Sequence, residues 1–200
     1  PRIHTFIGTS PLHREFQVKL SKEEVLDKVF ETVTFAKSFC DDVQWSPMDA
    51  TRTESEFLVE VVKIAIQAGA STINIPDTVG YTAPKESANI IKNLFFKIPE
   101  LKNIIVSTHC HNDLGMATAN SLAAVEAGAR QVECTINGLG ERAGNTALEE
   151  IVMALKVRKD ILPYETNMIT KKLIQASRLV SKVSGFPVQF NKAVVGKNAF

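Results

Sequence analysis

Cysteine is scarce in this sequence, with three residues in 200 and no Cys-x-x-Cys pair among them. An odd number of widely spaced cysteines argues against a disulfide framework, and the missing pair argues against a structural zinc site. Free thiols persist in reducing compartments, so the sequence favours a cytoplasmic location. We expect Cys110 and Cys134 to be packing residues.

The sequence also lacks an excess of charge of either sign, and it lacks long apolar runs. The sequence has 23 basic and 22 acidic residues, which leaves a formal net charge of +1. Proteins that neutralise many phosphates usually carry a basic excess, so we expect no nucleic acid partner. No stretch approaches the roughly 20 apolar residues that cross a bilayer, and the first residues do not resemble a signal peptide. We therefore expect no membrane partner.

A repeat of about 30 residues is present, in which a short apolar segment precedes a polar turn and an amphipathic helix. Ser21 is placed to cap the first helix, with Glu24 at its third position, and Gly69 and Gly128 are placed to end two others. Alternating strands and helices predict an α/β fold with a parallel sheet. The predicted strands are 3–7, 43–45, 72–75, 104–108 and 131–136, and the predicted helices are 22–39, 54–68, 85–97, 116–127, 146–158 and 170–183.

Two α/β architectures have such a sheet: a doubly wound open sheet and a closed eight-stranded barrel. Every predicted strand ends in polar residues, which favours the barrel, because its strands deliver side chains to one common mouth. Five units cannot close a ring of eight. We therefore predict that residues 1–185 form part of a (β/α)8 TIM barrel, of which roughly 90 residues are missing.

The segment 107–113, with the sequence STHCHND, carries the strongest chemical signal. Side chains alternate along a strand, so His109 and His111 project to the same side. Two imidazoles spaced in this way can converge on one divalent cation. Two polar residues bonded to loop backbone are the plainer interpretation, but the nearby Asp113, with Asn145 in the next unit, favours a metal site.

A glycine-rich segment, 137–145 (NGLGERAGN), follows the fifth predicted strand. Its spacing matches neither the dinucleotide-binding GxGxxG pattern nor a P-loop. A turn that caps the following helix, with Asn145 as the N-cap residue, would explain the glycines and the asparagine. It would not explain Glu141 and Arg142, a charged pair at the predicted mouth.

The segment 74–80 (NIPDTVG) and His4 carry weaker signals. Asn74, Pro76 and Thr78 share one face of a strand by period two. A plain strand-to-helix turn also explains this segment, and a lone histidine in an apolar strand is more often a hydrogen-bonded core residue than a ligand. No Gly-x-Ser-x-Gly elbow occurs, so the sequence gives no support for a Ser-His-Asp nucleophile.

Taken together, these segments resemble the bacterial α-isopropylmalate synthase family over essentially the whole chain. The wider group includes homocitrate and citramalate synthases and hydroxymethylglutaryl-CoA lyases. The resemblance implies that barrel strands four to eight are present, that residues 186–200 begin a linker to a C-terminal subdomain, and that the protein is a homodimer. It rests on the segments 2–6 (RIHTF), 49–53 (DATRT), 74–81 (NIPDTVGY), 109–113 (HCHND) and 126–145.

The implied reaction condenses acetyl-CoA, as co-substrate, with 2-oxoisovalerate to give 2-isopropylmalate and CoA, a step of leucine biosynthesis. The resemblance further implies a divalent cation, Mn²⁺ or Mg²⁺, held by His109, His111 and Asn145. The family's remaining ligand, an aspartate of the first barrel strand, belongs to a motif that this sequence lacks. A non-catalytic barrel fragment that pairs with another subunit is therefore an alternative.

The resemblance also assigns roles around the cation. His4 and Thr78 would bind the 2-oxo acid, Glu141 would be a catalytic residue near the acetyl group, and Arg142 would be a weaker substrate-binding candidate. One position departs from the family, because Met48 stands where a glutamate is usual. A changed preference for the 2-oxo acid is one explanation, so a homocitrate- or citramalate-type synthase is a second alternative.

Overall fold

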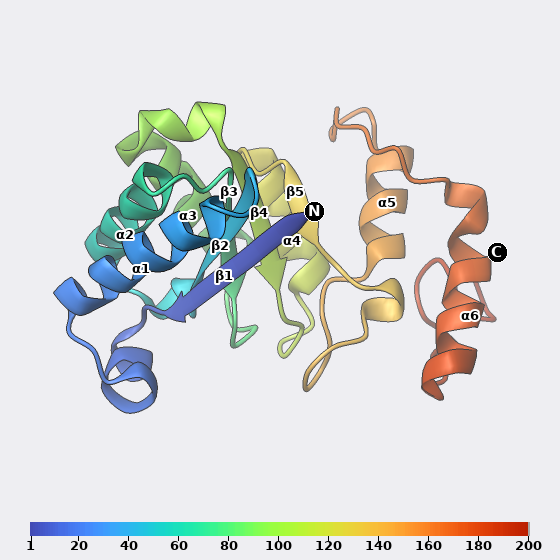
Figure 1. Ribbon diagram of the computed structural model, residues 1–200. Coiled ribbons are helices and arrows are strands. Elements are labelled where there is room, and N and C mark those ends of the chain that lie inside the picture. The colour runs from blue at the N-terminus through green and yellow to red at the C-terminus, as the bar shows by residue number, and fades with distance from the viewer. Residues whose placement is uncertain (200) are drawn as a thin grey trace.

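The computed structural model describes residues 1–199, which contain a five-stranded parallel sheet with the strands in the order β1-β2-β3-β4-β5 (Figure 1). Each strand pairs with the next strand along the chain. A doubly wound sheet would reverse its strand order at one point, so the observed order agrees with the predicted barrel. The strands are β1 (Arg2–Gly8), β2 (Asp42–Met48), β3 (Thr72–Asp77), β4 (Ile105–Cys110) and β5 (Gln131–Glu133).

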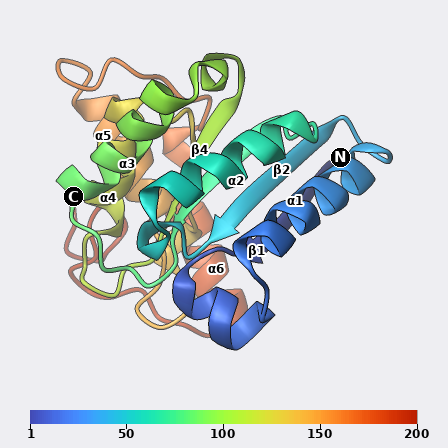
Figure 2. The same cartoon turned by 90° about the vertical axis from the view of Figure 1, so that its left-hand side faces the viewer.

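A helix follows each strand, and a sixth helix follows α5 along the chain. Helices α1 and α2 lie side by side, α1 over β1 and β2 and α2 over β2 and β3, and α5 and α6 stand together at the β5 end of the molecule (Figures 1 and 2). None of the helices within residues 1–199 is both long and apolar enough to span a membrane. The helices are α1 (Lys22–Lys37), α2 (Ser55–Gln67), α3 (Pro84–Lys97), α4 (Ala117–Ala127), α5 (Leu148–Val157) and α6 (Leu173–Ser184), with short turns at η1 (His13–Val18), η2 (Ala50–Arg52), η3 (Pro99–Asn103), η4 (Ile136–Gly138) and η5 (Thr170–Lys172).

The side of the sheet that faces the helices is apolar. Alternate residues of the central strands point outward and are buried in one core with the inner stripes of α1, α2 and α3. Burying a side chain of this size contributes roughly 1.5–3 kcal/mol, so this layer holds the helices on the sheet. The strand residues in it are Val43, Trp45, Ile73, Ile75 and Val106.

The opposite, inner side of the sheet is polar, and its side chains form a connected set that we call the inner polar network. Arg2 Nη1 donates to Gln131 Oε1 at 2.6 Å, which joins the first strand to the last and shows how strongly the sheet curls. Gln44 accepts a hydrogen bond from Gln131 and donates one to Glu133. The network comprises Arg2, His4, Gln44, Ser46, Asn74, Ser107, His109, Gln131 and Glu133.

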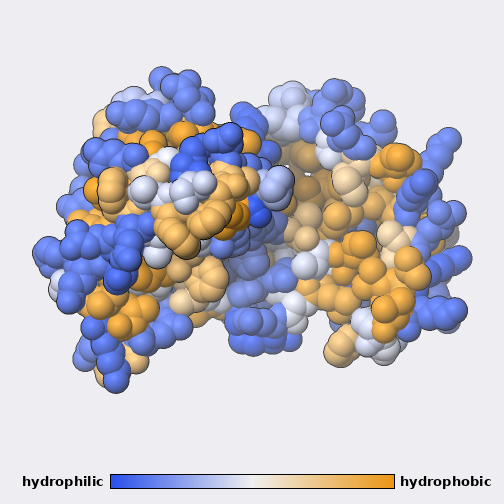
Figure 3. Space-filling model, in the orientation of Figure 1, coloured by the Kyte–Doolittle hydropathy of each residue, from blue (hydrophilic) through white to orange (hydrophobic). Residues whose placement is uncertain are grey.

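Helices α5 and α6 lie outside the main core. A separate small cluster of Ile151, Leu155 and Leu162 packs beneath α5. Figure 3 shows hydrophobic side chains gathered on the surface over these two helices, where Leu179 and Val183 are exposed.

The predicted helix signals were mostly correct. Ser21 Oγ accepts a hydrogen bond from the backbone N–H of Glu24, whose carboxylate accepts one from the N–H of Ser21 in return. Gly69 and Gly128 have φ of 106° and 128°, and each ends a helix. The prediction that Asn145 caps the last barrel helix was wrong. That helix begins at Leu148, because residues 145–147 are extended and form isolated bridges to the ends of β4 and β5.

Candidate metal and substrate site

The two histidines of the HxH motif meet at the carboxyl end of β4. His109 is on the strand and His111 follows it directly. Their Nε2 atoms lie 3.2 Å apart, and their ring planes are inclined at 81°. At this distance the two nitrogens either share one proton or act together as ligands of one cation.

The ring of His111 is held from behind by backbone. Its Nδ1 atom lies 2.6 Å from the carbonyl oxygen of Thr78, which also accepts a hydrogen bond from Arg142 Nη2 at 2.8 Å. Arg142 Nη2 lies 2.9 Å from the same Nδ1 atom, so both an oxygen acceptor and a guanidinium hold this edge of the ring. These contacts turn the other ring nitrogen, Nε2, toward His109.

The backbone of Asn145 lies next to that of His111. The two residues pair through an isolated antiparallel bridge, and the Asn145 Nδ2 atom donates to the carbonyl oxygen of Leu139 at 3.1 Å. The Asn145 Oδ1 atom is buried without a hydrogen-bond partner. Buried polar atoms are normally paired, so this unpartnered oxygen is available as a ligand of a cation.

The donor set within the described residues is partial. Residues 1–199 contain no cluster of three His, Cys, Asp or Glu side chains that could hold a metal by itself. Two imidazole nitrogens and one amide oxygen provide three of the six positions that Mg²⁺ or Mn²⁺ prefers. The residues fit such a cation and leave positions open for further ligands.

The glycines of segment 137–145 let this loop close tightly around Asn145. A Cβ atom at Gly140 would overlap the carboxamide of Asn145, and one at Gly144 would overlap the carbonyl oxygen of Gly138. Gly144 also has a φ of 95°, which side-chain-bearing residues rarely adopt. The loop can close this tightly only because these positions have no side chain.

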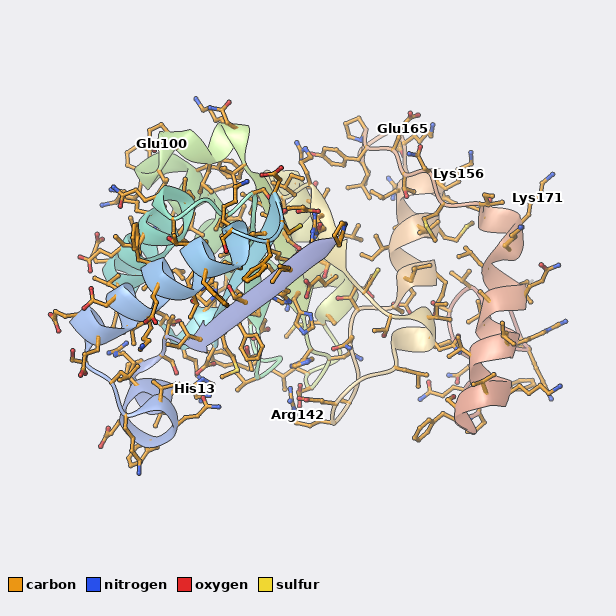
Figure 4. The ribbon with its side chains drawn as sticks, viewed as in Figure 1. His13, Glu100, Arg142, Lys156, Glu165 and Lys171 are labelled. Atoms are coloured by element: carbon orange, nitrogen blue, oxygen red, sulfur yellow. The ribbon has the colours of Figure 1, made fainter. Side chains whose placement is uncertain are left out.

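Arg142 and Glu141 lie at the rim of the site. Arg142 Nε and Nη2 donate to the two carboxylate oxygens of Asp113 at 2.7 and 2.8 Å. This hydrogen bonding lowers the pKa of Asp113 and raises the pKa of Arg142. Figure 4 shows Arg142 at the tip of its loop. Glu141 is exposed, and its carboxylate lies 3.3 Å from the Arg142 guanidinium, so the structure pairs it with Arg142 at the rim.

His4 and Thr78 lie on neighbouring parts of the inner side. His4 Nε2 is 2.7 Å from the hydroxyl of Ser46, and burial lowers the pKa of its imidazole. The hydroxyl oxygen of Thr78 accepts a hydrogen bond from the backbone N–H of Asp49 at 2.9 Å, which leaves its own hydrogen free to donate. Both side chains can therefore offer neutral polar contacts to a small anion.

Glu133 is a site residue that the sequence interpretation missed. It pairs in register with His109, and its Oε2 atom lies 2.9 Å from Nδ1 of that ring. Burial alone would raise the pKa of Glu133, but the contact with His109 and the hydrogen bond from Gln44 hold this pKa below its usual value. Period-two alternation places this glutamate on the inner side of β5, so the signal was present in the sequence.

Comparison with known families settles the family of this chain. The pattern of the HMGL-like family matches residues 1–180. The chain belongs to the HMGL-like family. Two similar curated proteins are the 2-isopropylmalate synthases of Xanthomonas campestris pv. campestris (strain B100), 56% identical over 200 residues, and of Rhodopirellula baltica, 57% identical over 199 residues. Each match covers 100% of this chain and 38% of the relative, so the chain spans about two fifths of their length.

Solved structures of HMGL-like proteins have the same fold. An HMG-CoA lyase from Acinetobacter baumannii, solved with coenzyme A and 3-methylmalate, matches with a TM-score of 0.78 at 20% identity, covering 100% of this chain and 67% of that one. An HMG-CoA lyase from Pseudomonas aeruginosa also gives a TM-score of 0.78, at 18% identity, covering 94% and 64%. The predicted family resemblance and the predicted partial TIM barrel are confirmed, and the named relatives are enzymes.

Proposed function

We propose that this chain is the metal-binding part of a 2-isopropylmalate synthase-type acyltransferase. The proposed reaction joins acetyl-CoA, 2-oxoisovalerate and water to give 2-isopropylmalate and CoA. The observation that carries the proposal is the convergence of His109 Nε2 and His111 Nε2, 3.2 Å apart. Asn145, whose backbone pairs with that of His111, adds a buried oxygen without a partner. The identity of 53–57% to proteins named 2-isopropylmalate synthase supports it.

His109, His111 and Asn145 would hold a divalent cation, Mn²⁺ or Mg²⁺. When bound, such a cation supplies Lewis-acid chemistry at the carbonyl of a 2-oxo acid. The three residues belong to two successive βα units, and the backbone bridge between His111 and Asn145 fixes their spacing. Preorganisation of this kind lowers the cost of reaching the reactive geometry.

The substrate contacts follow from the position of each side chain. His4, kept neutral by burial, and the hydroxyl of Thr78 would donate to the oxygen atoms of the 2-oxo acid. Arg142 would attract its carboxylate at the rim. Glu141 would be a catalytic residue that works on the acetyl group, and its exposed position requires the loop to turn inward when acetyl-CoA binds.

The larger organisation is also proposed. Residues 1–185 would be the partial catalytic barrel, and residues 186–200 would begin the linker to a C-terminal subdomain. We further propose a cytoplasmic homodimer with acetyl-CoA as co-substrate. The greater length of the relatives supports a partial barrel followed by a further subdomain. The three free cysteines, Cys40, Cys110 and Cys134, are compatible with a reducing location.

The choice of 2-oxo acid is the most informative test. Met48 ends β2 on the inner side by alternation, two residues after Ser46, where the α-isopropylmalate synthase family usually has a glutamate. CoA release by the full-length protein encoded by the gene would be measured with Mn²⁺ and, separately, 2-oxoisovalerate, 2-oxoglutarate and pyruvate. We expect turnover with 2-oxoisovalerate and its loss on chelation of the metal. Turnover only with 2-oxoglutarate or pyruvate would indicate a homocitrate- or citramalate-type synthase, and metal binding without turnover would indicate a non-catalytic barrel.

A further inference from the structure

Each histidine of the pair has an oxygen atom behind its Nδ1 nitrogen. For His111 this is the carbonyl oxygen of Thr78, at 2.6 Å. For His109 it is the Glu133 carboxylate, whose Oε2 atom lies 2.9 Å away. An oxygen acceptor at Nδ1 holds that nitrogen protonated, directs the lone pair to Nε2 and makes Nε2 a better electron donor.

We propose that Glu133 is a positioning residue that orients His109 and increases its basicity as a ligand. The inference rests on the proposed function, because it requires His109 to bind a cation. His109 Nδ1 is buried and has no straight hydrogen bond among residues 1–199. The Glu133 carboxylate is the oxygen group beside it, with Oε2 at 2.9 Å from Nδ1.

The inner polar network holds the carboxylate in this place. Gln44 Nε2 donates to Glu133 Oε1 at 2.5 Å, and Asn74 Nδ2 contacts Oε2 at 3.4 Å. Gln44 is in turn fixed by Gln131 and Arg2. A glutamate that only stabilised the sheet would have no reason to place a carboxylate oxygen in contact with the imidazole of His109. The hydrogen bonds from Gln44 and Asn74 leave Oε2 able to accept from His109 as well.

The nearest purely structural explanation is that Glu133 serves only to accept hydrogen bonds from the side chains of Gln44 and Asn74. The two explanations differ in what a substitution changes. Glu133→Gln keeps the shape and removes the charge, so a structural role predicts altered stability and unaltered metal affinity. A positioning role predicts Mn²⁺ binding that is about 10- to 100-fold weaker, the range found when a partner of a metal-bound histidine is removed.

The test measures the loss of the free Mn²⁺ electron paramagnetic resonance signal as the full-length protein is titrated. The wild type and His109→Ala are compared first. Loss of Mn²⁺ binding in His109→Ala would support the metal site. Unchanged Mn²⁺ binding in that variant would contradict the proposed function. Glu133→Gln is then compared with Thr72→Val. Thr72 is buried on the same side of the sheet, by alternation with Asn74, and its Oγ1 atom has no hydrogen-bond partner among the described residues.

We expect weaker binding in Glu133→Gln and wild-type affinity, within about twofold, in Thr72→Val. Should Glu133→Gln fail to fold, Glu133→Asp keeps the charge but withdraws it by one methylene, and we expect its affinity to fall as well. Wild-type affinity in a folded Glu133 variant, with a His109-dependent site intact, would overturn the positioning role and leave the proposed function standing.

Discussion

The carbonyl oxygen of Thr78 lies 2.6 Å from Nδ1 of His111, and the other nitrogen of that ring, Nε2, faces His109. The carbonyl directly follows β3, whereas the imidazole directly follows β4. The orientation of a proposed ligand is therefore determined by the pairing of two strands, and metal affinity depends on the packing of the sheet.

Replacement of His111 by alanine should weaken Mn²⁺ binding by more than about 100-fold, because one of three ligands on this chain is lost. The side chain is nearly buried but its neighbours are polar, so we expect the circular dichroism spectrum to remain that of the wild type. His13→Ala is the matched control, since His13 lies beyond β1 beside Asp49, 3.9 Å away, and is not directed at the pair. Equal Mn²⁺ affinity in the two variants would count against the site.

Gly140→Ala tests how closely the glycine-rich loop approaches its own asparagine. The added methyl group would overlap the carboxamide of Asn145, so we expect Mn²⁺ binding to weaken by at least about tenfold with little change in the fold. Gly115→Ala is the control. Gly115 has a φ of 73°, and no atom lies near the position of an added Cβ. The Gly115→Ala protein should therefore lose about 1–2 kcal/mol of stability and keep its Mn²⁺ affinity. A Gly140→Ala protein that binds Mn²⁺ normally would contradict the role of Asn145.

Much of this architecture could be predicted from the sequence. The strand and helix order, the capping box at Ser21 and the helix-ending glycines are local signals, and local signals survive folding when the tertiary structure agrees with them. The HxH motif was informative for the same reason, because side chains two positions apart on a strand point to the same side. The pairing of His109 with His111 needed no long-range information.

The rest depended on pairings between distant segments. Asn145 looked like a helix cap because its neighbours resemble a helix start, but its backbone pairs with His111, 34 positions earlier by number, and the helix is delayed to Leu148. Glu133 was missed because its role appears only when β5 is set in register against His109 on β4. Sequence patterns specify which side a residue faces and leave its partner across the sheet undetermined.

Cys134 should react slowly with alkylating reagents in the folded protein. Burial, together with the nearby charges of Glu149 and Glu133, raises the pKa of its thiol to about 11. The reactive thiolate is then rare at pH 8, and we expect labelling at least about 100-fold slower than in the urea-unfolded chain, as followed by mass spectrometry of the peptide. Cys134→Ser identifies the labelled peptide. Equal rates in the folded and unfolded chains would show that the thiol is neither buried nor near these charges.

The ion pair between Arg14 and Glu54 should make stability depend on acid. Hydrogen bonds from Arg14 lower the pKa of Glu54 from 4.5 to about 2. A carboxyl group whose pKa is lower in the folded state stabilises the protein above pH 4.5, and this contribution disappears as the pH falls from 4.5 toward 2. The urea midpoint of the wild type should therefore fall more steeply below pH 4.5 than that of Glu54→Gln. Parallel curves for the two proteins would contradict the shift.

The inner polar network has a consequence for recombining this barrel with its relatives. Arg2 and Gln131 are 129 positions apart yet share one hydrogen bond, and Gln44 joins both. In each of these hydrogen bonds the donor and the acceptor come from different βα units. A chimaera with a crossover between β1 and β5 takes some donors from one parent and their acceptors from the other. Whether it folds therefore depends on whether both parents have the same residue types at these few inward positions.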